Sequence, residues 1–220
     1  MRLDARFSFD TLVVGAGNRL AVAAARAVAE QPGSVYNPLF VYGTTGLGKT
    51  HLMGAVAHLA GQLQPGLEVE YLALEEFMGQ MHAAISAGQL DAFSRRYEAV
   101  GVLLLDDVQF LAGRRETQDE LLRLFERMQM QGRQIVLTSD RPPAELDDVD
   151  DRLVSRLSGG LIVDVTAPDF ETRVAILRTL CRDRKLAFRD GMLEELARFE
   201  FTNVRELQGA LNRLAAHQAI

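Results

Sequence analysis

The sequence predicts an α/β fold in which helices flank a parallel five-stranded sheet, followed by a small all-helical domain. Five short runs are almost continuously apolar and rich in β-branched residues, as expected of central strands that are covered on both faces. Segments with a helical period lie between these runs, and strands that alternate with helices indicate a parallel sheet. After Val165 the strand signals stop and only helical patterns follow.

The five predicted strands set the order of the elements. They are LFVYG from Leu39, VEYLAL from Val69, GVLLLDD from Gly101, QIVLTSD from Gln134 and LIVDV from Leu161. One predicted helix runs from Asn18 to Ala29 and stops before Pro32 and Gly33, and another runs from Gln118 to Met130. We expect a boundary near Ala167, with an α/β domain over residues 1–166 and a helical domain over residues 167–220.

The last predicted helix begins at a capping box formed by Asn203 and Glu206. Arg205 then lies in the first turn, where a cation is disfavoured by roughly 0.3 to 1 kcal/mol because the helix dipole is positive there. A negative partner is therefore expected. It is either a bound anion, such as a triphosphate, or a local salt bridge to Glu206 or Glu200.

Composition narrows the class of protein. The chain has 220 residues, 48% of them hydrophobic, and this is enough for a sizeable core. The net charge of −6 means that any nucleic-acid contact needs a local basic patch. The single cysteine, Cys181, predicts a core thiol in a reducing compartment. No apolar run approaches the roughly 18 residues of a membrane span, so we expect a cytoplasmic protein, with association to the nucleoid left open.

The stretch GTTGLGKT, Gly43 to Thr50, predicts a phosphate-binding loop because it follows a strand and precedes a helix. Its backbone N–H groups would surround the phosphates of ATP or ADP, Lys49 would reach the β and γ oxygens, and the Thr50 hydroxyl would ligate Mg²⁺. The run LLLDD carries Asp106 and Asp107 to the carboxyl end of a buried strand, where ligands bind on open α/β sheets. We expect Asp106 to hold Mg²⁺ and Asp107 to polarise the attacking water.

Two further polar residues allow two interpretations each. Asp140 ends the strand QIVLTSD and either approaches the γ-phosphate or caps a loop. Arg156, in DRLVSRLSGG, is either an exposed surface arginine or a functional one.

The chain resembles the AAA+ core of the bacterial DnaA replication initiators. Matching blocks occur in order along almost the whole chain. They are FSFDTLVVGAGNRLAVAAARAVAEQPGSVYNPLFVYG, GLGKTH, LLLDDVQFLAG, IVLTSDRPPAELDDVDDRLVSRL, ETRVAILR and NVRELQGALNRL. The resemblance implies a P-loop NTPase with sheet order 5-1-4-3-2, a helical lid, binding of ATP and ADP, and ATP-dependent head-to-tail oligomers.

The resemblance also implies roles for residues. Asp140 becomes sensor 1, Arg205 sensor 2, and Arg156 the arginine finger that acts in trans on a neighbouring subunit. The implied catalytic set is Lys49, Asp107, Asp140, Arg156 and Arg205, and the metal ligands are Thr50 and Asp106. The implied nucleotide-binding set, with the base near the first three, is Val13, Val14, Asn37, Gly43, Thr44, Thr45, Gly46, Leu47, Gly48, Lys49, Thr50, His51 and Arg205.

The chain departs from the family pattern mainly where the family binds DNA. Thr44 replaces a glycine in the phosphate loop, which is a tolerable change. Glu116 occupies a place where an initiator often has an arginine directed to single-stranded DNA, and His82 stands where an apolar residue is common. We therefore expect weakened single-stranded DNA binding. Arg114 and Arg115 either contact the DNA backbone or belong to a solvated loop.

Three functions are compatible with these features. The first is the ATP-binding and ATP-hydrolysing module of a DnaA-like initiator, slow and assembly-dependent, which switches assembly and DNA engagement with its nucleotide. The second is a DnaA-related regulator that contacts other replication proteins without binding DNA. The third is a small-molecule kinase or NTPase, which the lid arginine and the finger position disfavour.

Overall fold

The computed structural model describes residues 6–218 and contains one five-stranded parallel sheet. The strands are β1 (Leu39–Tyr42), β2 (Val69–Ala73), β3 (Val102–Asp106), β4 (Gln134–Ser139) and β5 (Leu161–Asp164). Their order is β2-β3-β4-β1-β5, which is the expected order read from the other edge. All neighbouring strands pair in parallel, so the predicted fold class is confirmed. Each strand ends one residue before the end of its predicted run. The chain leaves the sheet there, by a loop in four cases and, after β2, by a helix that begins at Leu74.

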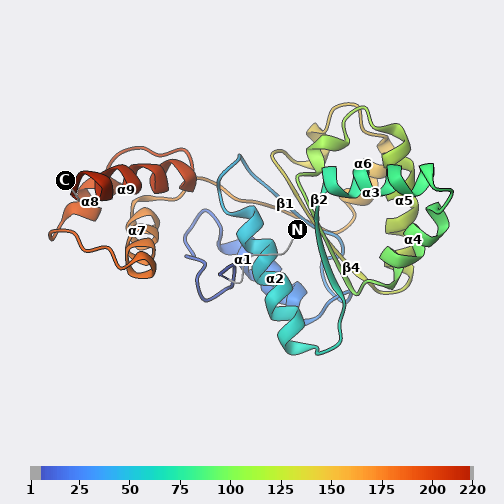
Figure 1. Cartoon of the computed structure of the whole chain (residues 1–220), viewed down its shortest axis with the longest axis horizontal. Helices are drawn as coiled ribbons and strands as arrows, with labels where there is room; N and C mark the ends of the chain where they lie inside the picture. The colour runs from blue at the N-terminus through green and yellow to red at the C-terminus, as the bar shows by residue number, and fades with distance from the viewer. Residues whose placement is uncertain (1–5, 219–220) are drawn as a thin grey trace.

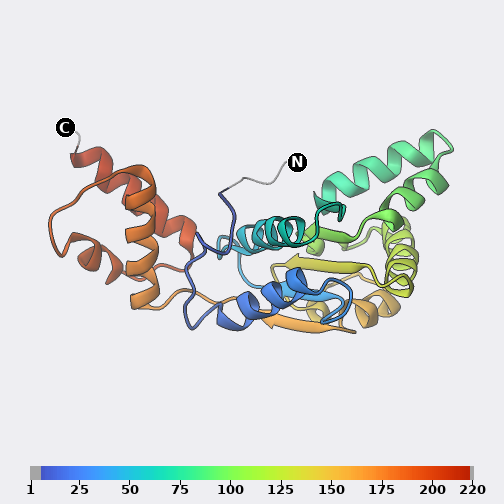
Figure 2. The ribbon, with the colours of Figure 1, turned by 90° about the horizontal axis from the view of Figure 1, so that it is seen from below.

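Helices cover both faces of the sheet (Figures 1 and 2). The helices α1 (Arg19–Glu30) and α2 (Lys49–Leu63) pack on one face against the side chains of Val102 and Leu104. The other face carries four helices: α3 (Leu74–Ser86), α4 (Leu90–Ala99), α5 (Arg115–Met130) and α6 (Asp151–Leu157). Two short 3₁₀ turns, η1 (Val108–Leu111) and η2 (Pro143–Glu145), follow strands β3 and β4.

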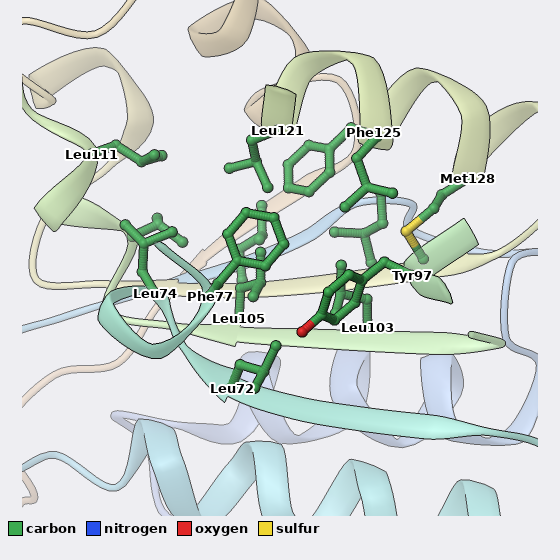
Figure 3. Packing of buried hydrophobic residues seen from close by; sticks show 14 of the residues in the cluster. Leu72, Leu74, Phe77, Tyr97, Leu103, Leu105, Leu111, Leu121, Phe125 and Met128 are labelled. Atoms are coloured by element: carbon green, nitrogen blue, oxygen red, sulfur yellow. The ribbon is translucent and has the colours of Figure 1, made fainter. Parts of the chain in front are cut away.

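The strand β3 shows how the sheet divides these two cores. Leu103 and Leu105 point to the face covered by α5, whereas Val102 and Leu104 point to the opposite face, as the period of two requires. Figure 3 shows Leu103 and Leu105 beneath Phe125 of α5, beside Phe77 and Tyr97 of the neighbouring helices. Because both faces of β3 are buried along its whole length, its carboxyl end is held rigidly.

A third cluster of buried side chains lies in the helices that follow the sheet. These are α7 (Phe170–Arg184), α8 (Met192–Ala197) and α9 (Val204–Gln218), which share Leu177, Leu207 and Leu211. Cys181 is a free, buried thiol of this cluster, as expected. The predicted boundary between residues 166 and 167 falls between β5 and α7, and the division into two domains stays a prediction.

Among residues 6–218, no helix has both the length and the apolar character that crossing a membrane requires.

Candidate active site

A cavity of about 430 Å³ opens at the carboxyl ends of β1 and β3, between the sheet and the start of α9. It collects residues from four separate parts of the chain. Its lining consists of Phe7, Thr45, Gly46, Gly48, Lys49, Thr50, His51, Asp107, Gln109, Phe110, Val204, Arg205 and Gln208. Five residues of the predicted loop are therefore brought together with Asp107 and Arg205, although the three parts are far apart in the sequence.

The predicted phosphate loop joins β1 to α2. Gly46 and Gly48 have φ values of 87° and 93°, a conformation that other residues rarely adopt. At Gly43 a Cβ atom would lie 2.3 Å from the carbonyl oxygen of Val165. The glycines are thus required by the path of the loop. Leu47 is buried and packs in the core on one face of the sheet, which anchors the loop. Thr44 lines a second cavity together with Asp140.

Lys49 is buried and folds back over the loop. Its Nζ donates to the carbonyl oxygens of Gly43 at 2.6 Å and Thr44 at 3.2 Å. Burial lowers the pKa of Lys49, an effect that the charges of Asp107, Asp106 and Asp140 oppose and that of Arg205 reinforces. The ammonium group is therefore a buried positive charge that a bound anion would stabilise.

Asp106 is buried and accepts hydrogen bonds from three hydroxyl groups. The Thr50 Oγ1 and the Tyr71 hydroxyl each donate to Oδ2 at 2.8 Å, and the Thr138 Oγ1 donates to Oδ1. Burial, followed by the nearby charge of Asp106 and the hydrogen bond to it, raises the pKa of Tyr71. Thr50 and Asp106 thus present adjacent hard oxygen atoms, and this donor set fits Mg²⁺.

Sequence reasoning missed Tyr71 and Thr138. Thr138 belongs to the polar triplet that ends the strand QIVLTSD, so that pattern carried a signal for it. Tyr71 lies inside an apolar strand and had no such signal, because a buried tyrosine usually packs as a core residue.

Asp107 and Asp140 are linked through Gln109. Asp107 has a left-handed backbone with φ of 60°, and its N–H donates to the Thr138 Oγ1 at 3.0 Å. The Gln109 Nε2 donates to the Asp107 Oδ1 at 3.2 Å, and its Oε1 accepts the Asp140 N–H at 3.3 Å. The Asp140 carboxylate binds Arg141 at 2.9 and 3.2 Å and faces the neighbouring cavity rather than the main one. The role of Asp140 toward a nucleotide stays a prediction.

Arg205 reaches the phosphate loop from α9. The Val204 N–H donates to the Gly46 carbonyl oxygen at 3.0 Å, and a Cβ atom on Gly46 would lie 3.2 Å from the Arg205 Cγ. Asn203 caps the helix by accepting the Glu206 N–H at 2.9 Å, as expected.

The local salt bridge considered for Arg205 is absent. The Glu206 carboxylate accepts hydrogen bonds from Thr202 and Asn203, and these lower the pKa of Glu206. No ion pair of Arg205 with Glu206 or Glu200 occurs within residues 6–218. Arg205 thus lines the cavity as an exposed cation that has no ion pair with a carboxylate in the described part of the chain.

His51 lies in the cavity wall and holds the N-terminal segment. Its ring stacks on Phe7 with centroids 5.0 Å apart, and its Nε2 lies 3.0 Å from the Ser8 carbonyl oxygen and 3.2 Å from the Thr11 Oγ1.

The residues expected around the base are not gathered in the main cavity. The Val13 carbonyl oxygen accepts from the Asn18 Nδ2 at 2.9 Å, and Val14 is half exposed. Three residues that follow them, Gly15, Gly17 and Asn18, line a small cavity with Leu47 and Val204. Val13 and Val14 therefore lie beside the lid junction, and their contact with a base stays a prediction.

Asn37 lies apart from the phosphate loop, and its expected contact with a nucleotide stays a prediction. It precedes β1, whereas the phosphate loop follows β1, so about 13 Å of strand separates them. Its Nδ2 donates to the Arg133 carbonyl oxygen at 2.7 Å, and its Oδ1 accepts the Ile135 N–H at 3.0 Å. Asn37 thus joins β1 to the start of β4 and is not brought to the loop.

Three other predicted residues lie on the surface away from the cavity. Arg156 on α6 forms an ion pair with Glu126 at 3.0 Å, and both side chains are about half exposed. Glu116 in the first turn of α5 and His82 on α3 are both exposed.

Comparisons with known proteins show which proteins the chain is similar to. Residues 3–164 match the model of the bacterial DnaA ATPase domain family. The chromosomal replication initiator protein DnaA of Clavibacter sepedonicus is 45% identical over 219 residues, which is 100% of this chain and 46% of that protein. The chain thus spans about half the length of the curated relatives it matches.

Solved structures of initiators share the architecture. Domain III of the Thermotoga maritima replication initiation protein DnaA has a TM-score of 0.93 at 39% identity, covering 100% of this chain and 91% of that one. A replication initiator DnaA bound to AMPPCP and single-stranded DNA has a TM-score of 0.89 at 37% identity, covering 97% of this chain and 66% of that one.

Proposed function

The chain belongs to the bacterial DnaA ATPase family, and from that premise we propose that it binds and hydrolyses ATP at Gly43–Thr50 and changes its assembly and DNA engagement with the bound nucleotide. One observation carries the proposal. The N-terminal end of α9 contacts the phosphate loop through Val204 and Gly46, and Arg205 lines the same cavity as Lys49, Thr50 and Asp107. A triphosphate bound there would contact positive charge from both sides, from Lys49 of the α/β part and from Arg205 of the lid.

Each residue has a task in this proposal. Lys49 and the loop N–H groups bind the phosphates, and the Thr50 hydroxyl and the Asp106 carboxylate hold Mg²⁺. When bound there, Mg²⁺ neutralises charge on the phosphate oxygens. Asp107 orients the attacking water, Asp140 and Arg205 sense the γ-phosphate, and Val13 and Val14 contact the base.

Arg156 cannot serve its own cavity, because α6 and the lid lie on opposite sides of the molecule (Figure 1). We assign it to the cavity of a neighbouring copy in a head-to-tail assembly. Hydrolysis is then slow in isolated molecules, because an arginine supplied in trans contributes about 10³ to 10⁵ to the rate in well-studied nucleotidases.

The proposal is tested by Arg205→Ala. Removing one charge-assisted contact should weaken ATP binding by about 10-fold, with ADP affected less, because the γ-phosphate is what distinguishes the two. Titration calorimetry with both nucleotides measures this. Arg213→Ala, on the same helix but outside the cavity lining, is the matched control. Equal ATP affinity for Arg205→Ala and the unaltered protein would contradict the lid's part in binding.

A regulator that does not bind DNA is the second candidate, favoured by the exposed acidic side chain of Glu116 in the first turn of α5. The similar initiator bound to single-stranded DNA favours DNA binding instead. Fluorescence anisotropy of labelled single-stranded DNA with ATP, with ADP and without nucleotide separates the two. ATP-specific binding supports the initiator, and absence of binding under all three conditions supports the regulator.

A further inference from the structure

Gln109 connects the ends of two strands at the cavity. It lies in η1, two residues after Asp107, and it lines the cavity itself. Its amide nitrogen binds the Asp107 carboxylate at 3.2 Å, and its amide oxygen binds the backbone N–H of Asp140 at 3.3 Å. One planar group therefore fixes the carboxylate that follows β3 relative to the residue that follows β4.

Both contacts together require a carboxamide. A carboxylate only accepts hydrogen bonds and a backbone N–H only donates, so the bridging group must donate at one end and accept at the other. Glutamate would keep the acceptor but bring a like charge to Asp107. Asparagine would be one methylene shorter than the span, and methionine would offer neither contact.

Asp107 is otherwise held only by its backbone in the contacts described above. Its left-handed φ of 60° and the hydrogen bond from its N–H to Thr138 set where its Cβ projects. They do not set the rotation of the carboxylate about the side-chain bonds. The Gln109 contact occupies Oδ1, so Oδ2 is left as the oxygen that can face a water molecule.

We propose that Gln109 is a positioning residue that orients the Asp107 carboxylate for the attack of water on ATP. This inference rests on the proposed function. In the step, the water oxygen bonds to the γ-phosphorus while the bond from that phosphorus to the β–γ bridging oxygen breaks. ADP leaves with the electron pair, and the proton lost by the water passes to Asp107 and then to solvent. Productive geometry must be held within about 0.5 Å, which a freely rotating carboxylate does not achieve.

The test compares Gln109→Glu and Gln109→Met with the unaltered protein. Three quantities are measured: kcat for ATP hydrolysis, the Kd of AMPPCP, and the Kd of ADP with aluminium fluoride, which mimics the phosphoryl group in transfer. We expect kcat to fall about 10- to 100-fold in both variants, the range typical of residues that orient a ligand or catalytic group. The affinity for ADP with aluminium fluoride should fall in parallel, while the Kd of AMPPCP stays within about twofold.

The matched control is Gln62→Glu, an exposed glutamine on α2 outside the cavity lining, which adds the same charge elsewhere. The inference is overturned if kcat of either Gln109 variant stays within about twofold of the unaltered protein, or if AMPPCP affinity falls as much as kcat, since that would indicate a purely structural role. Failure of the unaltered protein to bind AMPPCP would instead overturn the proposed function.

Discussion

At the scale of one residue, Lys49 is a buried cation whose position favours anion binding over stability. The fold buries this cation beside two carbonyl oxygens, and no ion pair neutralises it within residues 6–218. Burial lowers its pKa, which means that the folded state bears a cost for the charge. Because the buried ammonium group lowers stability and can pair with an anion, its presence is better explained by ligand binding than by a structural role.

We therefore predict that Lys49→Met separates stability from binding. The melting temperature should stay within about 2 °C, because the loss of two hydrogen bonds is offset by the removal of a buried charge. ATP affinity should fall by more than about 100-fold, since the strongest phosphate contact is gone. Differential scanning fluorimetry and calorimetry measure the two effects. The chain's second lysine, Lys185, is exposed, and Lys185→Met should change neither. A large drop in melting temperature for Lys49→Met would show that Lys49 is mainly structural.

At the scale of elements, α2 has two functions. Its first turn carries Lys49 and Thr50, and its side holds the N-terminal segment against the cavity. The His58 Nδ1 donates to the Phe7 carbonyl oxygen at 2.6 Å, because a carbonyl can only accept. Phe7 also lies over Gly54, where a Cβ atom would be 2.4 Å from the Phe7 Cβ. The cavity wall thus depends on a glycine in the middle of a helix.

Two glycines of α2 provide a matched pair for testing this contact. Gly54→Ala should displace the segment that contains Phe7 and destabilise the protein by about 1 to 3 kcal/mol, as overpacking does. Gly61 has no atom within 4 Å of an added Cβ, so Gly61→Ala should stabilise by up to about 1 kcal/mol through helix propensity. Urea denaturation measures both, and limited proteolysis reports release of the N-terminal segment. Equal effects of the two substitutions on stability would show that Phe7 moves aside without cost when a Cβ atom is added at Gly54.

At the scale of the whole molecule, the cavity and Arg156 lie on different surfaces. The lid helices α7 to α9 lie at one end of the molecule, and α6 lies in the opposite half (Figure 1). A contact between two different surfaces leaves one of them free on each end copy. Repeated copies would therefore form a ring if their rotation closes and an open helical filament if it does not. The exposed ion pair of Arg156 with Glu126 is worth only about 0 to 1 kcal/mol, and it would give way to a better anion at little cost.

Arg156→Ala should leave ATP affinity nearly intact and abolish ATP-driven assembly. Static light scattering with ATP and with ADP measures assembly, and calorimetry measures affinity. Arg152→Ala is the control, because Arg152 lies on the same helix and is likewise exposed and paired with acidic residues. If Arg156→Ala forms the same oligomers with ATP as the unaltered protein, Arg156 does not contribute to the interface between copies.

The sequence by itself determined the strands, the phosphate loop and the cap of the last helix. These features depend on neighbours in the chain. Apolar runs make buried strands, the glycines that become Gly46 and Gly48 allow a left-handed path, and Asn203 bonds a group three residues away. It also indicated that Asp106 and Thr50 lie at the same edge of the sheet, because one ends a parallel strand and the other belongs to the loop and helix that follow another. Their side chains are joined by a hydrogen bond, and their role as metal ligands stays a prediction.

Only the tertiary structure decided which polar groups meet across the sheet. Tyr71 and Thr138 surround Asp106, and Gln109 joins Asp107 to Asp140, through contacts between residues more than 30 positions apart in all but one case. It also decided that Asn37 lies at the opposite end of the sheet and that, within residues 6–218, Arg205 forms no ion pair with Glu206 or Glu200. The physical reason is that a side-chain hydrogen bond acts over about 3 Å in space, and strand order and lid position, not sequence distance, determine what lies within that range.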